Sequence, residues 1–405
     1  MTRHRPAGAD VDDAGPGLRA ARSLARPGTA NPLGSTSRRH PAARFEDAFD
    51  SALVATLRRR GWTVRIEAYP GYGAAGWVRL FGRAILAAPY TTDVDLPGAG
   101  AGQAGDDETA PPSTVRGWRS FLTAPVAGAW VDVEVEDEDA DADQDEDGRQ
   151  VHRVHTDRGG YLDHRLAIDL PPGLHHLTLR TQDGRTARAP VHVVGPDSRV
   201  GLVSDIDDTV MVTRLPRPLV AAWNVLVRDE NAREPVPGMA DLYRALCRID
   251  PELPVMYLST GAWNAAPAIG RFLHRSDFPT GTLLMTDWGP TNTGWFRSGP
   301  RHKVAQLRRL FAELPQIRWV LVGDDGQRDP EIYAGAVRLH PDHVRAVLIR
   351  QLTFAEHVLA HGSPVPIAES AQAERSAAAT RVPVLQGADG RSLLAQARRA
   401  GLIHR

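Results

Sequence analysis

After Pro196 the sequence alternates compact apolar segments with stretches of helical patterning, and this alternation limits the fold more than any other feature. The apolar segments are RVGLVSD, LPVMYLST, GTLLMTD, IRWVLVGDD and VRAVLIRQL. Continuous apolar strands separated by helices are typical of a parallel sheet covered by helices on both faces. Ligands bind such sheets at the carboxyl ends of the strands. We therefore expect the functional residues of this region to follow its strands.

Four consecutive elements place polar residues at that expected edge of the sheet. In chain order they are Asp205, Asp207 and Thr209 after the first strand, Ser259 after the second, Lys303 at the start of a helix, and Asp324, Asp325 and Asp329 after a later strand. A single acidic turn is common in proteins and predicts little. Polar clusters at the ends of four consecutive elements predict one shared site.

Lys303 is the only lysine in the chain, which otherwise carries its positive charge on arginine. An ammonium group is a compact charge on a flexible stem, whereas a guanidinium group is a wide planar fork. A site that needs the smaller cation would explain why one lysine remains. The competing interpretation is that a single lysine has remained by chance.

Together these residues predict phosphoryl transfer through an aspartate. A carboxylate nucleophile forms an acyl-phosphate and so divides one difficult displacement into two easier ones. Carboxylates and a phosphate dianion repel one another, so we expect a hard cation, Mg²⁺, to join Asp205 and Asp324. Lys303 would neutralise charge on the phosphoryl group, and Ser259 would donate a hydrogen bond to it.

The order of the clusters resembles the haloacid-dehalogenase superfamily, whose motifs are D-x-D-x-T, a Ser or Thr, a Lys, and an acidic G-D-D or G-D-x-x-x-D. More closely, GLVSDIDDTVMVT, YLSTGAWN, SGPRHK and GDDGQRDPEIY resemble the phosphatidate phosphatases of the actin-patch protein type, relatives of the lipins. Two upstream segments, PGYGAAGWVRLFGRAIL and TDRGGYLDHRLAIDLPPG, resemble the N-terminal region of bacterial members. These motifs are specific in combination.

The resemblance implies Asp205 as the nucleophile, Asp207 as the general acid and base, and Ser259 and Lys303 as phosphate-binding residues. We also expect Thr209 to bind phosphate. The short stretch between the first two motifs leaves room for only a small cap. An open site of that kind accepts a bulky or membrane-embedded substrate.

Five carboxylates are candidate Mg²⁺ ligands: Asp205, Asp207 and Asp324, with Asp325 and Asp329 as weaker candidates. The chain departs from the family pattern at two positions, with Asp325 in place of Ser and Thr260 in place of Asn. Neither departure removes a catalytic group. The extra carboxylate would strengthen metal binding or hydrogen-bond to the ligands from outside.

The part of the chain before Pro196 has a different pattern. Residues 1–44 mix Arg, Ala, Gly, Pro and Ser without periodicity and are predicted to be a disordered tail. Residues 45–198 begin with a helix and continue as short alternating runs separated by turn residues, the pattern of an all-β sandwich-like domain. A Gly/Ala/acid stretch at 97–112 and an acidic run at 134–148 are predicted to be low-complexity loops within this domain.

The expected fold class is therefore an α/β Rossmann-like haloacid-dehalogenase hydrolase domain preceded by an all-β sandwich-like domain. The hydrolase domain is expected over residues 199–362, and a C-terminal linker and helix over 363–405. The terminal segment RSLLAQARRAGLIH has the pattern of a basic amphipathic helix. Such a helix lies on a membrane or docks on the protein, and the sequence leaves both open.

Composition narrows the setting in which the protein works. Basic and acidic residues balance, 48 against 49, which gives no argument for a nucleic acid partner. The single cysteine, Cys247, excludes a disulfide framework and favours a reducing cytoplasm. No apolar segment is long enough to span a membrane, and the N-terminus lacks a signal-peptide core. We expect a cytoplasmic protein that reaches phospholipid as a peripheral protein on the inner face of the membrane.

Several aromatic and basic side chains near the predicted site are candidates for lipid contact. They are Trp263, Trp288, Trp295 and Phe296, with Arg297 and Arg301. Amphipathic aromatic rings suit a membrane interface. Packing in the core is the alternative for each ring, and simple exposure is the alternative for each arginine.

The predicted function is hydrolysis of phosphatidate to diacylglycerol and phosphate, with Mg²⁺ as cofactor. Two alternatives remain open from the sequence. One is a phosphatase for a soluble phosphomonoester, and the other is a membrane- or protein-binding module whose hydrolase domain is idle. The sequence does not identify the partner of the β domain.

Overall fold

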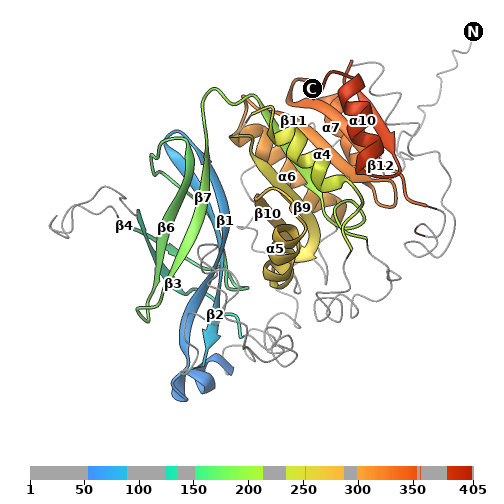
Figure 1. Ribbon diagram of the computed structural model, residues 1–405. Helices are drawn as coiled ribbons and strands as arrows, with labels where there is room; N and C mark the ends of the chain where they lie inside the picture. The colour runs from blue at the N-terminus through green and yellow to red at the C-terminus, as the bar shows by residue number, and fades with distance from the viewer. Residues whose placement is uncertain are drawn as a thin grey trace, which may run out of the picture.

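The computed structural model describes residues 53–88, 124–135, 151–212, 234–250, 252–286, 299–353, 356 and 381–403. The strands of these residues form two sheets (Figure 1). We call residues 63–194 the β unit and the described residues from 200 to 403 the α/β unit. The predicted tail, the loop at 97–112 and most of the acidic run lie outside the described residues.

Seven strands form the sheet of the β unit. They are β1 (Thr63–Ala74), β2 (Trp77–Ala87), β3 (Trp130–Val135), β4 (Val151–His155), β5 (Tyr161–Leu166), β6 (Gly173–Thr181) and β7 (Thr186–Val194). Their spatial order is β4-β3-β6-β7-β1-β2-β5, and all neighbours are antiparallel except β1 and β7. Residues 53–59, within the predicted first helix, are helical.

This sheet encloses its own apolar core because it curls. The two edge strands approach each other, and the His164 Nε2 atom of β5 lies 2.8 Å from the carbonyl oxygen of His155 in β4. Alternate residues such as Leu177 and Leu179 of β6 point inward and are fully buried. The prediction of a β-rich N-terminal region is confirmed. The described strands form one continuous curled sheet, whereas a sandwich would have two separate sheets.

The sheet of the α/β unit has six strands, all parallel to their neighbours. They are β8 (Val200–Asp205), β9 (Val255–Ala262), β10 (Thr282–Thr286), β11 (Arg318–Asp324), β12 (Val344–Arg350) and β13 (Val384–Gly387), in the order β10-β9-β8-β11-β12-β13. The strands β8 and β10 are buried along their whole length, as the continuous apolar runs predicted. The sequence thus predicted the parallel sheet correctly.

Helices cover this sheet. They are α4 (Met239–Cys247), α5 (Ala266–Arg275), α6 (Gly299–Glu313), α7 (Asp329–Leu339) and α10 (Gly390–Arg399), with single 3₁₀ turns at Trp263–Ala265 and Pro341–His343. The chain leaves β8 toward β9 through α4 and leaves β11 toward β12 through α7. Because such crossovers are right-handed, helices that run in these opposite directions cover opposite faces. The point at which the strand order changes direction lies between β8 and β11.

The C-terminal residues complete the α/β unit. Strand β13, which the sequence did not predict, pairs with β12 as the sixth strand of the sheet. Helix α10 begins at an Asp389–Ser392 capping box and buries Leu393 and Ala397 beside α4. Docking on the protein, one of the two interpretations that the sequence left open, is therefore confirmed for this face of the helix. Of the described residues, no helix is long and apolar enough to cross a membrane.

The two units share one apolar core at their contact. The ring of Trp263 lies between the ring of Tyr69, at a centroid distance of 4.9 Å, and the ring of Phe81, at 5.6 Å. On helix α6, the Glu313 carboxylate accepts hydrogen bonds from the Tyr72 hydroxyl and the Arg79 guanidinium of the β unit. The β unit is thus packed against the elements that carry the polar clusters.

Candidate active site

The predicted polar residues gather where the sheet changes direction. Asp205 ends β8 and Asp324 ends β11, and these strands are neighbours in the middle of the sheet. Because the crossovers diverge there, the carboxyl ends of the two strands are left open to a ligand, as is usual in sheets of this kind. The alternating pattern therefore placed the site at the correct edge.

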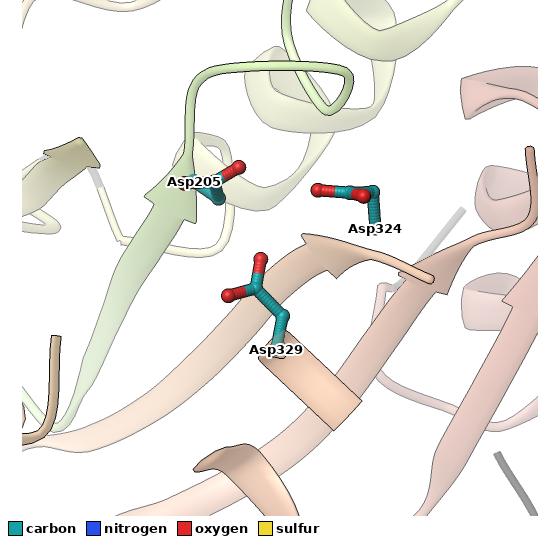
Figure 2. A group of neighbouring side chains, drawn as sticks. All are labelled: Asp205, Asp324 and Asp329. Atoms are coloured by element: carbon teal, nitrogen blue, oxygen red, sulfur yellow. The ribbon is translucent and has the colours of Figure 1, made fainter. Parts of the chain in front are cut away.

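Three carboxylates come together at this edge. Oxygen atoms of Asp205, Asp324 and Asp329 lie within 4.8 Å of one another, and all three side chains are buried (Figure 2). Asp329 joins them because it opens α7, which turns the chain back over the end of β11. Gly323 makes room for it, since a Cβ atom at that position would lie 2.5 Å from the Asp329 Oδ2 atom.

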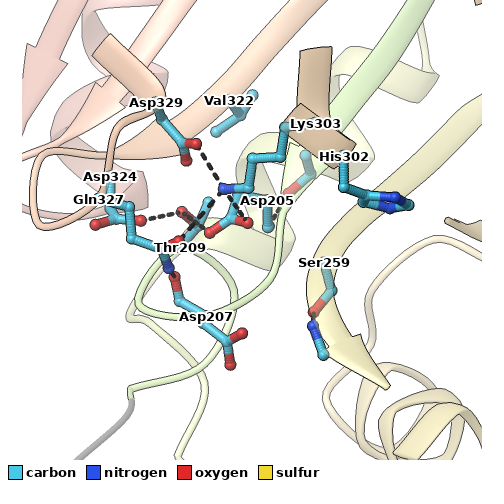
Figure 3. A network of polar contacts seen from close by, with 12 residues as sticks. Asp205, Asp207, Thr209, Ser259, His302, Lys303, Val322, Asp324, Gln327 and Asp329 are labelled. Atoms are coloured by element: carbon cyan, nitrogen blue, oxygen red, sulfur yellow. Dashed lines mark hydrogen bonds and ion pairs between the residues drawn. The ribbon is translucent and has the colours of Figure 1, made fainter. Parts of the chain in front are cut away.

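Lys303 ties two of these carboxylates together. Its Nζ atom lies 2.6 Å from Asp205 Oδ1 and 2.5 Å from Asp329 Oδ1, and the side chain is buried (Figure 3). The Oε1 atom of Gln327 lies 3.5 Å from the same ammonium group. A single compact cation therefore contacts two carboxylates in a buried space, which agrees with a site that needs the smaller cation.

The site holds more negative than positive charge, and the pKa values reflect this. Burial raises the pKa of Asp205 to about 8, against the opposing effect of Lys303 and with a further increase from Asp329. Burial, Asp329 and Asp205 likewise raise the pKa of Asp324 well above its usual value. Burial would lower the pKa of Lys303, but the surrounding carboxylates outweigh it and the pKa is raised.

The donor set fits a hard divalent cation. Within the part of the chain that the structure describes, the Asp329 Oδ2 atom is buried and has no hydrogen-bonding partner. A buried carboxylate oxygen without a donor is costly unless a cation faces it. Carboxylate oxygens in this number suit Mg²⁺, which also keeps waters and substrate oxygens as ligands. The residues that could hold such an ion are Asp205, Asp324 and Asp329.

Two hydroxyl side chains border the carboxylates. The Thr209 hydroxyl is fully buried and lies 3.5 Å from both Asp205 Oδ2 and Asp324 Oδ2. Ser259 is also fully buried, and its Oγ atom accepts the Gly261 N–H at 2.9 Å. Because Oγ acts as an acceptor here, its own hydrogen can donate to a ligand. Figure 3 shows Ser259 on β9, to one side of Asp205 and Asp207 and apart from the three carboxylates.

Asp207 lies beside the three carboxylates without joining them. Its side chain points away from Lys303 in Figure 3 and is only partly buried. Its carbonyl oxygen accepts a hydrogen bond from Gln327 Nε2 at 3.4 Å, and Gln327 in turn contacts Lys303. The structure therefore brings Asp329, rather than the Asp207 side chain, into the group that could hold a metal.

Asp325 and Asp329, the two weaker candidates for metal ligands, lie in different places. The Asp325 carboxylate accepts the backbone N–H of Leu352 at 2.8 Å and does not belong to the metal-binding group. Asp329, in contrast, is one of the three members of that group. The sequence offered one signal for this difference, the G-D-x-x-x-D spacing that joins Asp324 to Asp329. Gln327 was missed, because a glutamine in an acidic loop carries no signal of its own.

The candidate lipid contacts have mixed outcomes. Trp263 is buried between aromatic rings of the β unit, so core packing is confirmed for it and the membrane interpretation is wrong. Arg301 is exposed on α6. The remaining candidates, Trp288, Trp295, Phe296 and Arg297, lie outside the described residues.

Comparison with known proteins supports the motif analysis. Residues 200–351 match the family described as "Phosphatidate phosphatase APP1, catalytic domain". The chain is 24% identical over 202 residues to the phosphatidate phosphatase APP1 of Saccharomyces cerevisiae, covering 48% of this chain and 34% of the yeast protein. It is 23% identical over 155 residues to an uncharacterized protein of Schizosaccharomyces pombe, covering 38% of this chain and 25% of that protein.

These matches confirm the resemblance to phosphatidate phosphatases of this type, and the family match lies within the α/β unit. The chain spans about a third of the yeast relative and a quarter of the fission yeast one. A carbohydrate acetylesterase from Xanthomonas citri aligns with 82% of this chain and 72% of its own at 11% identity. Its TM-score of 0.27 is too low to support any argument about fold or function.

Proposed function

We propose that this chain is a Mg²⁺-dependent phosphatase that hydrolyses phosphatidate to diacylglycerol and phosphate through an aspartyl-phosphate on Asp205. The observation that carries the proposal is the contact of Lys303 with both Asp205 and Asp329, beside Asp324 at the open edge of the sheet. The match of residues 200–351 to a phosphatidate phosphatase catalytic domain supports the choice of substrate. The fold we propose for this unit is that of the haloacid-dehalogenase hydrolases.

The reaction would take place in two displacements. An Asp205 oxygen attacks phosphorus, the bond between phosphorus and the glycerol oxygen breaks, and Asp207 protonates that oxygen as it leaves. Water then attacks the phosphorus of the aspartyl-phosphate while Asp207 accepts its proton, which releases phosphate and restores Asp205. The partly buried position of the Asp207 carboxylate, turned away from Lys303, suits a group that must exchange protons with substrate and water.

Three residues would hold Mg²⁺, namely Asp205, Asp324 and Asp329. The ion would supply positive charge that offsets the repulsion between the carboxylates and the phosphate dianion. The raised pKa values of Asp205 and Asp324 show how much charge burial alone leaves uncompensated. Asp205 must be ionised to act as a nucleophile, so the positive charges around it decide how much of the protein is reactive.

The remaining residues would hold the phosphoryl group. Lys303 keeps Asp205 in position from one side and faces the charge that develops in the transition state. Ser259 has a hydroxyl hydrogen that can donate to a phosphoryl oxygen, and Thr209 lies between the two strand-end carboxylates. None of these groups has to reorganise far during the reaction, because all are buried.

We also propose the organisation and setting of the chain. The hydrolase domain would extend over 199–362, between the β domain of 45–198 and the C-terminal segment of 363–405, which adds β13 and α10. The substrate would be met at a membrane surface, with the protein cytoplasmic and peripheral on the inner face. The enzyme resemblance supports this setting because phosphatidate is a membrane lipid.

The proposal is tested by measuring phosphate release from phosphatidate in detergent micelles against a panel of soluble phosphomonoesters, with Mg²⁺ and with excess chelator. We expect phosphatidate to have the highest kcat/KM and chelation to remove activity. A soluble ester with a much higher kcat/KM would establish the alternative substrate class. Absence of turnover on every substrate, by a protein that still binds phosphatidate vesicles, would establish the idle module.

A further inference from the structure

Arg350 is a buried guanidinium group that the reaction above does not use. It ends β12, next to β11, and its side chain is only 4% exposed. Its Nη1 atom donates to the carbonyl oxygen of Asp208 at 2.6 Å, its Nη2 atom donates to Glu356 Oε1 at 2.6 Å, and its Nε atom donates to the carbonyl oxygen of Ala388 at 3.4 Å. Each of the three guanidinium nitrogen atoms therefore donates a hydrogen bond.

The first of these contacts reaches the turn that carries Asp207. Asp208 has a φ of 59°, a left-handed conformation that is uncommon for residues other than glycine. Its N–H donates to the carbonyl oxygen of Met211, and the N–H of Val210 donates to that of Ile206. Such a turn persists only when its surroundings fix it, and the Arg350 contact fixes the carbonyl next to Asp207.

We propose that Arg350 is a positioning residue that holds the Asp207 carboxylate where it can protonate the leaving oxygen. The proposal rests on the function proposed above, in which Asp207 is the general acid. Rotation of the peptide after Asp208 would swing the whole turn, and with it the Asp207 side chain. Two hydrogen bonds oppose that rotation, one from Arg350 to the Asp208 carbonyl oxygen and one from Gln327 to the Asp207 carbonyl oxygen.

The third contact connects this turn to the C-terminal residues. Ala388 follows β13, and the N–H of Gln351 donates to the carbonyl oxygen of Gly387 at 2.8 Å. These residues lie after the region matched by the catalytic family, which ends at 351. The residues that follow β13 therefore contact the same guanidinium that holds the turn. In this way the C-terminal segment would contribute to the position of the Asp207 carboxylate.

A lysine cannot replace Arg350 in this role. The three acceptors lie around one plane, which matches the fixed fork of a guanidinium and not the single point of an ammonium group. Arg350→Lys keeps the charge beside Glu356 and removes the planar arrangement. The matched control is Arg345→Lys, at the other end of the same strand, where the half-buried guanidinium faces Arg318 and not the turn.

The test compares phosphatidate with an analogue in which sulfur replaces the oxygen between glycerol and phosphorus. A thiolate leaves without a proton, so loss of general acid catalysis slows the oxygen ester and spares the sulfur analogue. Both substrates are presented in the same micelles with Mg²⁺, and kcat/KM is measured for the parent, Arg350→Lys, Arg345→Lys and Asp207→Asn. Thermal midpoints show whether each variant is folded.

We expect Arg350→Lys to lose kcat/KM on phosphatidate by about 10- to 100-fold, since a displacement on the order of 1 Å costs about that much. On the sulfur analogue it stays within about threefold of the parent, and Arg345→Lys stays there on both substrates. Equal losses of Arg350→Lys on the two substrates, or no loss on either, would overturn the proposal. Equal losses would show that Arg350 has only a structural role, and no loss would show that Arg350 is dispensable for activity.

The Asp207→Asn variant tests the proposed acid role of Asp207 independently of the proposed role of Arg350. A loss on phosphatidate that largely disappears on the sulfur analogue confirms Asp207 as the acid, and Arg350 is then judged against it. Equal losses for Asp207→Asn overturn the acid role and the inference together. If Arg350→Lys does not fold, Glu356→Gln replaces it, because it loosens one arm of the guanidinium. We expect a smaller loss with the same preference for the sulfur analogue, and its absence would overturn the proposal.

Discussion

Helix α6 carries a buried charged side chain near its start and a partly buried one at its end, and the surroundings of the two differ. Near its start, Lys303 meets Asp205 and Asp329, with Asp324 close by, so one positive charge faces three carboxylates. At its end, the two oxygens of Glu313 accept from the Arg79 guanidinium and the Tyr72 hydroxyl. The charge at the Glu313 end is balanced by groups of the protein, whereas the Lys303 end has more negative than positive charge.

The difference separates stability from function. When the two charges of a partly buried ion pair match, loss of either partner leaves the other uncompensated, so the pair helps to fix how two parts of a protein pack. A buried cluster with an excess of one charge is unfavourable until something from solution neutralises it. The Glu313 end therefore holds the β unit on the α/β unit, and the Lys303 end has the excess of negative charge that the proposed cation would offset. Four experiments test this contrast.

The largest effect is expected at the proposed nucleophile. Asp205→Asn keeps the shape of the side chain but cannot form the acyl-phosphate, so kcat should fall on the order of 10⁴-fold or more. Phosphate release and thermal unfolding are measured together. Asp325→Asn is the control, because its side chain bonds the Leu352 N–H and an amide oxygen can still accept it. A variant of Asp205 with substantial residual activity would contradict the assigned role.

The second experiment exchanges the cation at each end of α6. Lys303→Arg should lower kcat/KM by about 100-fold, because the wider fork displaces Asp205 or the phosphoryl group by about 1 Å. Arg309→Lys lies on the same helix and contacts Asp163 of the β unit at 2.8 Å. It should leave kcat/KM within about twofold of the parent, since exposed ion pairs contribute little. Equal effects of the two exchanges would remove the distinction between the ends.

The third experiment adds the missing positive charge and follows stability instead of activity. Mg²⁺ at about 100 times its dissociation constant should stabilise the folded protein by about 2.7 kcal/mol. The thermal midpoint should therefore rise by several degrees in the parent and remain unchanged in Asp324→Asn. Ca²⁺ at the same concentration tests the selectivity of the site. No rise in the parent with any divalent cation would contradict the interpretation of the three carboxylates as a metal site.

The smallest effect on activity is expected at the balanced end. Glu313→Gln removes the charge that faces Arg79 and should lower the free energy of unfolding by about 1 to 3 kcal/mol. The kcat of the folded protein, measured well below its thermal midpoint, should change by less than about threefold. A large fall in kcat with an unchanged midpoint would show that this contact supports catalysis directly.

The sequence predicted which side chains gather at this edge of the sheet better than it predicted how they are arranged. Asp205, Ser259, Lys303 and Asp324 follow or precede buried strands, and the parallel sheet brings such positions to one edge whatever the loops do. The place of Asp329 beside Asp205 and Asp324 could not be predicted, because it depends on the path of the loop between β11 and α7. No local pattern in that loop fixes where the first turn of the helix will lie.

The errors in the fold have similar physical causes. Strand β5 carries little sequence signal because four of the six residues of YLDHRL are partly or fully exposed, which hides the alternation that identifies a strand. Strand β13 has only four residues and pairs at an edge. The contact of Glu313 with Arg79 joins residues 234 positions apart. Nothing in an amphipathic helix shows which of its polar residues will meet such a partner.

The stacking of Trp263 between Tyr69 and Phe81 has a consequence for how the protein is made. Ribosomes deliver the chain from the N-terminus, so the β unit emerges well before the residue that covers its aromatic rings. During that interval Tyr69 and Phe81 belong to an apolar surface open to other chains, and partly made domains of this kind are prone to aggregate. Folding in the cell should therefore depend on chaperones that occupy this surface until β9 has been synthesised.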